Sequence, residues 1–283
     1  MNDHQVRFAL PGLGDGDRAR FWRARRHHGL EGLTATFRRH RYVPHMHETY
    51  AIGVILAGCE TYDLRGERRY AQAGELCFVN PGEVHDGEPL GDGYSCRMSY
   101  PAAALLAEIT SDARGGRPVA TPYFAATNVR DPAAFEAFVA AHRRLEEDPE
   151  PLAGDEAMVR AYALILARHG GEAPPDQARP AGGAVDRVRE YLDEQYAEPI
   201  ELATLAEIAG LTRHHLIRLF KRRTGLTPHA YLTDCRVRAA RRRLVAGETP
   251  AEVAVACGFF DQSHLTRAFK ARTGISPGAF RAG

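Results

Sequence analysis

Long apolar stretches and paired cysteines are both missing from this sequence. The longest apolar run, residues 50–58, is far shorter than the roughly 20 residues of a membrane-spanning helix. Residues 1–4 do not begin a positive region followed by an apolar stretch, so we expect no signal peptide. The five cysteines include no Cys-x-x-Cys pair, which favours reduced thiols over a disulfide framework. These absences favour a soluble, cytoplasmic protein without a membrane partner.

Lysine is also scarce, because Lys221 and Lys270 are the only two lysines among the 37 basic residues. The net charge is only +1, but it is distributed unevenly. From residue 211 onward there are 14 Lys and Arg residues against 4 Asp and Glu residues. A basic segment in a nearly neutral chain indicates a polyanionic partner for that segment, although a solvated basic surface has the same composition.

A repeat occupies the last hundred residues. Residues 215–231 and 264–280 share ten of seventeen positions at an offset of 49 residues. The spacing of Lys221 and Lys270 is this same offset. Self-similarity of this kind indicates two copies of one supersecondary unit.

Each copy has the start and stop signals of a helix, a short turn and a second helix. Residues 249–252 form a capping box with proline at the first helical position. Thr212 and Asp261 stand where the second helices need N-caps. Glycines end the helices of both copies: Gly210 and Gly258 the first helices, Gly225 and Gly274 the second. The pattern predicts two helix-turn-helix units joined by a helix over residues 228–246, whose run of arginines would add affinity for phosphate.

The outer faces of the two second helices carry the candidate DNA-binding residues. In a major groove, arginine grips guanine, small hydroxyls bond several bases, and aliphatic groups pack on thymine methyls. Residues shared by the copies would contact phosphates or a common base, and differing residues would read different sequences. Solvated outer faces of two helical hairpins are the alternative. The candidates are Arg213, His214, Ile217, Arg218 and Lys221 in the first copy, and Gln262, Ser263, Thr266, Arg267 and Lys270 in the second.

The second copy also carries a family resemblance. Residues 258–270, Gly-Phe-Phe-Asp-Gln-Ser-His-Leu-Thr-Arg-Ala-Phe-Lys, are followed by Thr273-Gly-Ile-Ser-Pro277. This segment resembles the C-terminal signature of the AraC/XylS family of bacterial transcription activators. The wider resemblance to that family covers residues 184–280. The resemblance implies binding to double-stranded operator DNA, with the two units in successive major grooves, and RNA polymerase as a partner.

The N-terminal part has short β-rich runs separated by turns. The expected strands are residues 34–40, 50–56, 60–64, 69–71, 75–79 and 94–100. Many short strands at this spacing suggest a small jelly roll or barrel. Helices are expected over residues 102–111, 132–147 and 153–169, where they would pack on the barrel or, as the resemblance implies, form a homodimer.

Three histidines are the candidate site residues of this barrel. The segments Pro44-His45-Met46-His47 and Pro81-Gly-Glu-Val-His85 look like the two motifs of the cupin family. Cupin enzymes bind a metal through His-x-His, a glutamate three or four residues later and a distant histidine. Here Ala51 or Ile52 occupies the glutamate position, and Glu48 comes too early. We therefore predict that His45, His47 and His85 bind an effector without a metal or other cofactor; a three-histidine Zn²⁺ or Fe²⁺ site and a structural role are the alternatives.

The expected fold is α+β and multidomain. A cupin-like effector-sensing β-barrel (jelly roll) with accessory helices covers residues 1–169, and a flexible linker residues 170–183. An all-α tandem helix-turn-helix domain covers residues 184–283. The expected function is that of an effector-controlled transcription activator without catalytic residues. The alternatives are a DNA-binding protein whose barrel only dimerises, and a metal-dependent cupin enzyme with an accessory nucleic-acid domain.

Overall fold

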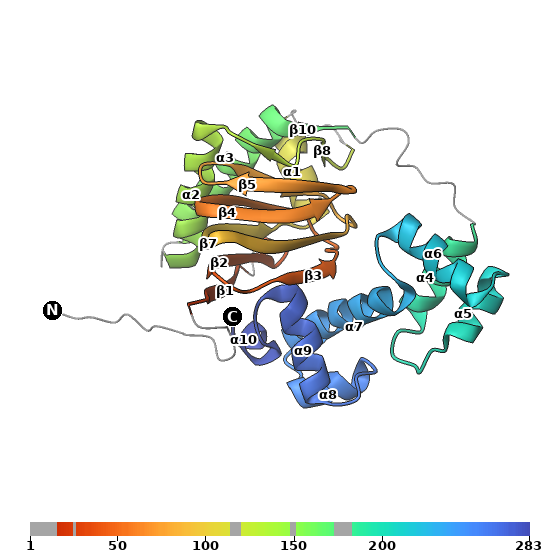
Figure 1. The fold of residues 1–283 in the computed structure, drawn as a ribbon. Coiled ribbons are helices and arrows are strands. Elements are labelled where there is room, and N and C mark those ends of the chain that lie inside the picture. The colour runs from red at the N-terminus through yellow and green to blue at the C-terminus, as the bar shows by residue number, and fades with distance from the viewer. Residues whose placement is uncertain (1–15, 25–26, 114–119, 148–150, 173–182) are drawn as a thin grey trace.

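The chain forms a sheet-rich N-terminal half beside an all-helical C-terminal half, as the computed structural model shows (Figure 1). It describes residues 16–24, 27–113, 120–147, 151–172 and 183–283. Within these ranges no helix is long and apolar enough to cross a membrane. The α+β architecture expected from the sequence is confirmed.

One curled antiparallel sheet contains most of the strands, in the order β1-β2-β7-β4-β6-β9, with β3 paired to β7 and β5 to β4. Register shifts interrupt the long β4–β7 pairing near Ala57 and Gly58, and such bulges bend a sheet. The strands are β1 (Arg18–Ala24), β2 (Leu30–Phe37), β3 (Tyr42–His45), β4 (Ala51–Leu64), β5 (Glu67–Gln72), β6 (Leu76–Val79), β7 (His85–Tyr100), β8 (Tyr123–Phe124), β9 (Asn128–Val129) and β10 (Gly170–Gly171).

The sheet differs from the sequence expectation in several places. The strands expected at 50–56 and 60–64 form one strand that begins at Ala51, because Gly58 is a bulge residue with φ of 74° rather than a break. The strand expected at 94–100 begins earlier, at His85, and strands β1 and β3 were not expected. Within the expected linker, Gly170 and Gly171 pair with β8, and residues 173–182 lie outside the described ranges.

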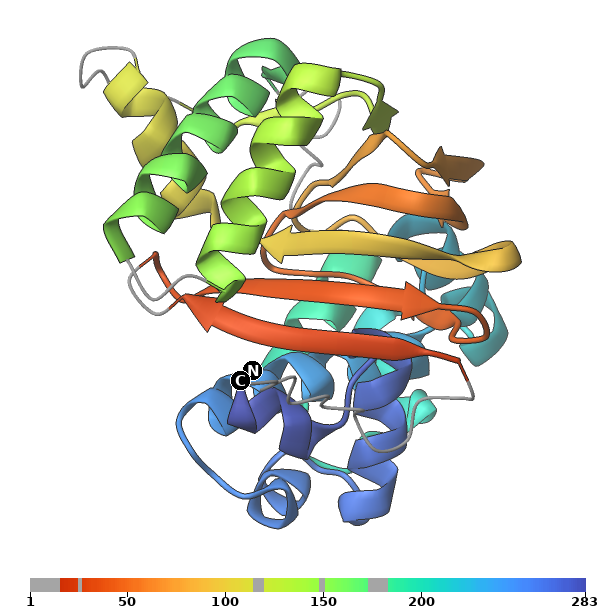
Figure 2. The same cartoon turned by 90° about the vertical axis from the view of Figure 1, so that its left-hand side faces the viewer.

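Helices α1 (Ala103–Ala113), α2 (Pro132–Glu147) and α3 (Pro151–His169) cover one face of the sheet (Figure 2). Strand β6 shows how alternation divides its side chains between two environments. Leu76 and Phe78 belong to the apolar cluster beneath the helices, whereas Cys77 and Val79 belong to the cluster on the opposite face. Because both faces are buried, all four residues of β6 are buried.

The C-terminal half contains the two expected helix-turn-helix units, joined by the long helix α7 (Figure 1). Thr212 and Asp261 cap the second helix of each unit, accepting bonds from the backbone N–H groups of His215 and His264. The helices are α4 (Ala184–Glu194), α5 (Leu202–Ala209), α6 (Arg213–Thr224), α7 (Pro228–Val245), α8 (Pro250–Ala256), α9 (Gln262–Thr273) and α10 (Pro277–Ala282).

The second unit packs directly on the sheet. The face of the sheet opposite α1–α3 and the second unit share one apolar cluster, which includes Phe37, Phe269 and Phe280. Phe21 on β1 packs against Phe280 with ring centroids 4.7 Å apart and ring planes tilted by 34°. The first unit has its own cluster around Leu216 and Phe220, on which Val84 of the sheet domain packs. The two copies therefore contact the sheet domain in different ways.

A buried ion pair fixes α2 to the sheet, and it provides a stability test. Arg97 on β7 pairs with Glu146 on α2, and their side chains are 8% and 2% exposed. Replacing Glu146 by alanine leaves the guanidinium buried with less compensation, so we expect a loss of about 3 kcal/mol in the free energy of unfolding. Glu156→Ala removes an exposed partner of Arg160 and should cost less than about 0.5 kcal/mol. Urea unfolding of both variants measures the difference, and equal stabilities would contradict this account.

Candidate functional site: a cavity at the domain interface and the outer faces of α6 and α9

A cavity of about 80 Å³ lies between the curled sheet and the second helix-turn-helix unit. From the sheet domain, its lining includes several Phe and Tyr rings, with the three predicted histidines, Glu60 and Asp86 among its polar groups. From the C-terminal half it is lined by Arg241, Arg272, Thr273, Ile275 and Phe280. The cavity is thus closed by residues of α7, of α9 and of the segment that follows α9.

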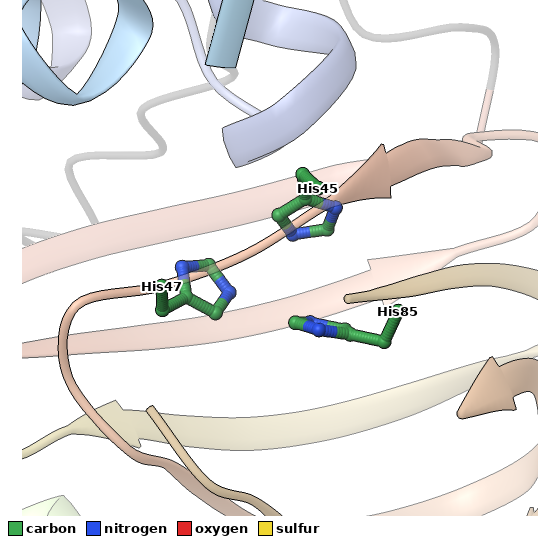
Figure 3. A group of neighbouring side chains, drawn as sticks. All are labelled: His45, His47 and His85. Carbon is green, nitrogen blue, oxygen red and sulfur yellow. The ribbon is translucent and has the colours of Figure 1, made fainter. Parts of the chain in front are cut away.

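Strand pairing brings the three histidines together. His45 ends β3 and His85 begins β7, and the two residues are paired in the antiparallel ladder. Their ring centroids lie 4.5 Å apart, and the His47 ring lies 4.9 Å from that of His45. Figure 3 shows the three rings turned toward a common space. The structure therefore brings the three predicted site residues together.

Backbone contacts orient two of the rings. Nδ1 of His45 lies 2.8 Å from the carbonyl oxygen of Val43, and Nδ1 of His85 lies 3.1 Å from that of Glu83. Nδ1–H donation to these carbonyls leaves both Nε2 atoms as acceptors. Burial lowers the pKa of all three histidines, which favours neutral rings. The cluster therefore offers hydrogen-bond acceptors to the cavity.

The same three histidines form the one candidate metal-binding group of the described residues. Their ligand atoms lie within 4.8 Å of one another. Zinc–nitrogen bonds of about 2.1 Å require tetrahedral ligands to approach to about 3.4 Å. The charges of Arg241 and Arg272 also act on His45, lowering its pKa after the larger effect of burial. These cations oppose a dication at the same rings, so we expect the three histidines to bind a metal ion only weakly.

Three polar cavity residues were missed by sequence reasoning. Burial raises the pKa of Glu60 to about 7, and its Oε1 accepts a hydrogen bond of 2.8 Å from the Tyr94 hydroxyl. Arg241 was counted among the phosphate-binding arginines, but it pairs with Glu31 of β2. Arg272 pairs with Asp234 of α7 at 3.6 Å. No local signal identifies these arginines as cavity residues, because their position depends on docking between halves of the chain.

Other α7 arginines are also engaged within the protein. Arg236 donates to the backbone carbonyls of Tyr196 and Glu198. Arg238 pairs with Asp234, Asp193 and Glu48. These contacts hold α7 against α4 and against the sheet domain, so the guanidinium groups are not free for phosphate in this arrangement.

The predicted DNA-binding residues lie on α6 and α9, and most of them are exposed. The exposed ones are Arg213, His214, Arg218, Lys221, Gln262, Ser263 and Arg267. Three others are half-buried, each with neighbours within the protein. Ile217 lines an apolar depression with Leu205 and Leu232. The hydroxyl of Thr266 donates to the Gln262 carbonyl oxygen at 2.8 Å. Lys270 lies near the sheet, where its charge adds to burial in lowering the pKa of His40.

Comparisons with known proteins agree with these two regions. Residues 27–162 match the model of the AraC-like ligand binding domain, and residues 205–283 match that of a helix-turn-helix domain. The uncharacterized HTH-type transcriptional regulator YbfI of Bacillus subtilis is 27% identical over 229 residues, covering 79% of this chain and 81% of YbfI. The HTH-type transcriptional activator RhaS of Pectobacterium atrosepticum is 30% identical over 116 residues, 41% of each chain.

The fold also has a solved counterpart. The crystal structure of ToxT from Vibrio cholerae matches with a TM-score of 0.53 and 10% identity, covering 95% of this chain and 98% of ToxT. Another ToxT structure, with a TM-score of 0.53 and 8% identity, covers 96% of this chain and 97% of ToxT and is described as bound to an unsaturated fatty acid. At such low identity the likeness shows the shared fold.

The positive charges beside the three histidines predict a low metal content. Purified full-length protein should contain zinc, iron and manganese at well below one ion per chain, since Arg241 and Arg272 disfavour a cation there. Elemental analysis measures this, with His45→Ala/His85→Ala protein as the comparison. One ion per wild-type chain that disappears in the double variant would contradict the prediction.

Proposed function

Because the chain belongs to the AraC family of transcription regulators, we propose that a small-molecule effector bound in the interface cavity controls its binding to double-stranded DNA. The chain carries both a ligand-binding domain and a helix-turn-helix domain of this family. The observation that carries the proposal is that α7 and α9 close the cavity. A molecule in the cavity contacts the DNA-binding half as well as the sheet, so its binding energy depends on how the two halves dock.

The proposed effector-binding residues of the sheet domain are His45, His47 and His85. Their neutral rings offer acceptors to ligand O–H or N–H groups, and the surrounding aromatic rings offer apolar surface. Sensing is favoured over catalysis because the residues that close the cavity also position a recognition helix. We assign the chain no catalytic residue and no cofactor.

The proposed DNA-binding residues are those on the outer faces of α6 and α9. Arg218 and Arg267 occupy the same place in the two copies, and both are exposed. His214 and Ser263 also occupy equivalent places but differ, so the two units would read unlike base sequences. The complete set is Arg213, His214, Ile217, Arg218, Lys221, Gln262, Ser263, Thr266, Arg267 and Lys270.

We also propose where the protein acts and which proteins it contacts. We propose that it is a cytoplasmic activator that contacts RNA polymerase, as the naming of RhaS as an activator suggests by analogy. We further propose that the N-terminal domains form a homodimer. Exposed apolar side chains on α3 support this, since Leu152 is 71% and Val159 43% exposed.

A double substitution tests the effector site. A thermal-shift screen of the full chain first identifies a metabolite that raises its Tm. In His45→Ala/His85→Ala protein that metabolite should no longer raise the Tm or change DNA affinity, whereas DNA binding without it should persist. Arg130→Ala serves as the control, because Arg130 pairs with Glu75 at the exposed surface and lines neither the cavity nor the adjoining groove. An unchanged effector response in the double variant would show that these histidines do not bind the effector.

An exchange between the copies tests the DNA-binding assignment. Two units in successive major grooves should select an operator with two unlike boxes about 10 base pairs apart. His214→Ser/Ile217→Thr gives the first unit the residues of the second at these positions. The variant should change its preference by about 1 kcal/mol or more per altered base pair, in the first box only. Selection from random DNA measures the preference, and a change in both boxes would contradict separate readout.

A further inference from the structure

Each copy of the repeat has an arginine at the same position, and the two arginines lie in different environments. Arg223 of α6 and Arg272 of α9 are equivalent at the 49-residue offset. Arg223 is exposed, whereas Arg272 is 8% exposed and lines the interface cavity. A repeated sequence therefore supplies a solvent-exposed guanidinium in one copy and a cavity-lining guanidinium in the other.

The Arg272 guanidinium is poorly compensated. Its Nη1 donates to the Ala268 carbonyl oxygen at 3.2 Å. Its Nε is buried and has no hydrogen-bond partner in the described structure, lying 3.6 Å from an Asp234 oxygen. Asp234 is shared, because its other oxygen accepts a bond of 3.1 Å from Arg238. Because its one ion pair is long and is shared with Arg238, this guanidinium favours a further anionic partner.

Arg241 is a second cation in the lining of the cavity. Arg241 lies over the Phe280 ring at 5.2 Å and pairs with Glu31. Together with His47 and Tyr100, Arg241 lines both the cavity and an adjoining groove of about 370 Å³ between the two halves. That groove has further arginines, Arg23, Arg238 and Arg242, against Glu31 and Glu48. Each of these arginines is paired within the protein, but the groove beside the cavity carries four arginines against two glutamates, and this net positive charge favours an anion nearby.

The size and lining of the cavity restrict the remainder of the ligand. A water molecule needs roughly 10–15 Å³ of such volume, so a cavity of about 80 Å³ has room for about five to eight groups of that size. Phe37, Tyr62 and Phe280 contribute apolar ring surface to it. An aliphatic chain of a few carbons or a single small ring fits these limits.

We infer that the effector is a small organic monocarboxylate whose carboxylate pairs with Arg272 of the second recognition helix. This inference rests on the proposed function, because it names the chemical class of the molecule in the effector cavity. The planar guanidinium matches a carboxylate, and the ligand body lies against the aromatic rings of the sheet. Occupancy then links α9 to the sheet through the ligand. The effector therefore contacts the second recognition helix directly, and its binding should affect base recognition in the second operator box most directly.

Matched charged and neutral probes test the inference on the full-length protein. The probes are butyrate, hexanoate and benzoate, each compared with its amide by calorimetry at constant ionic strength. At least one carboxylate should bind about tenfold or more tightly than its amide, as expected for a hydrogen bond to a charged group. This comparison uses wild-type protein, so it does not depend on whether any variant folds.

Substitutions at Arg272 and at its repeat equivalent Arg223 provide a second test of the inference. Arg272→Gln should lose about tenfold or more in carboxylate affinity, Arg272→Lys should lose less, and Arg223→Gln should keep the wild-type affinity. Binding of the amides as tightly as the carboxylates, or full carboxylate affinity in folded Arg272→Gln protein, would overturn the inference. If no carboxylate binds but a neutral metabolite raises the Tm through His45 and His85, the inference fails and the proposed function stands. If no metabolite of any charge binds in the cavity, both fail.

Discussion

The contact between the second helix-turn-helix unit and the open face of the sheet is the interaction on which the other features depend. It buries Phe269 and Phe280 in the same cluster as Phe37, and burying a side chain of this size contributes about 1.5–3 kcal/mol. The same contact closes the cavity, buries Arg272 and shields the histidine rings from water. Without it, the face of the sheet opposite α1–α3 would be an open aromatic surface, and the polar groups on it would be solvated.

Glycine at the end of each recognition helix allows the two units to approach the sheet domain. Gly274 has φ of 76°, and a Cβ atom there would lie 2.6 Å from the Tyr42 hydroxyl oxygen. At the equivalent Gly225, a Cβ atom would lie 3.0 Å from Val84. Each glycine thus ends its helix in the left-handed region and also leaves space for a neighbouring strand or turn. A residue with a larger side chain at position 274 would push α9 away from β3.

Sequence reasoning located the features that depend on short-range interactions. The N-caps Thr212 and Asp261 and the helix-ending glycines are local signals, and the helices they delimit agree with expectation. Strand β3 was missed because it is short and contains Pro44, and its pairing with β7 is a long-range interaction. Strand β7 was predicted too short because Pro89, Gly91 and Gly93, which are typical of turns, lie inside it.

The candidate site was predicted in part for the same reason. His45, His47 and His85 follow from motif spacing, but Arg241 and Arg272 enter the cavity only through docking of the halves. Ile217 and Lys270 have outward positions on a helical wheel, yet both are half-buried in the folded chain, Ile217 beside Leu205 and Leu232 and Lys270 near His40. A helical wheel describes a single helix, and it contains no information on what lies beside that helix.

The apolar cluster shared by the sheet and the second unit has a consequence for the construction of chimeric regulators. Fusion within residues 170–183 separates the chain at its most evident break in sequence pattern, but it leaves α9 and α10 facing a foreign sensor. A sensor domain taken from another regulator forms a closed cavity here only if its own surface is complementary to Phe269, Phe280 and Arg272 of the second unit. The functional module for exchange is therefore the sheet domain together with its second helix-turn-helix unit, whereas the first unit, which packs on Met46 and Val84, depends less on the sheet domain.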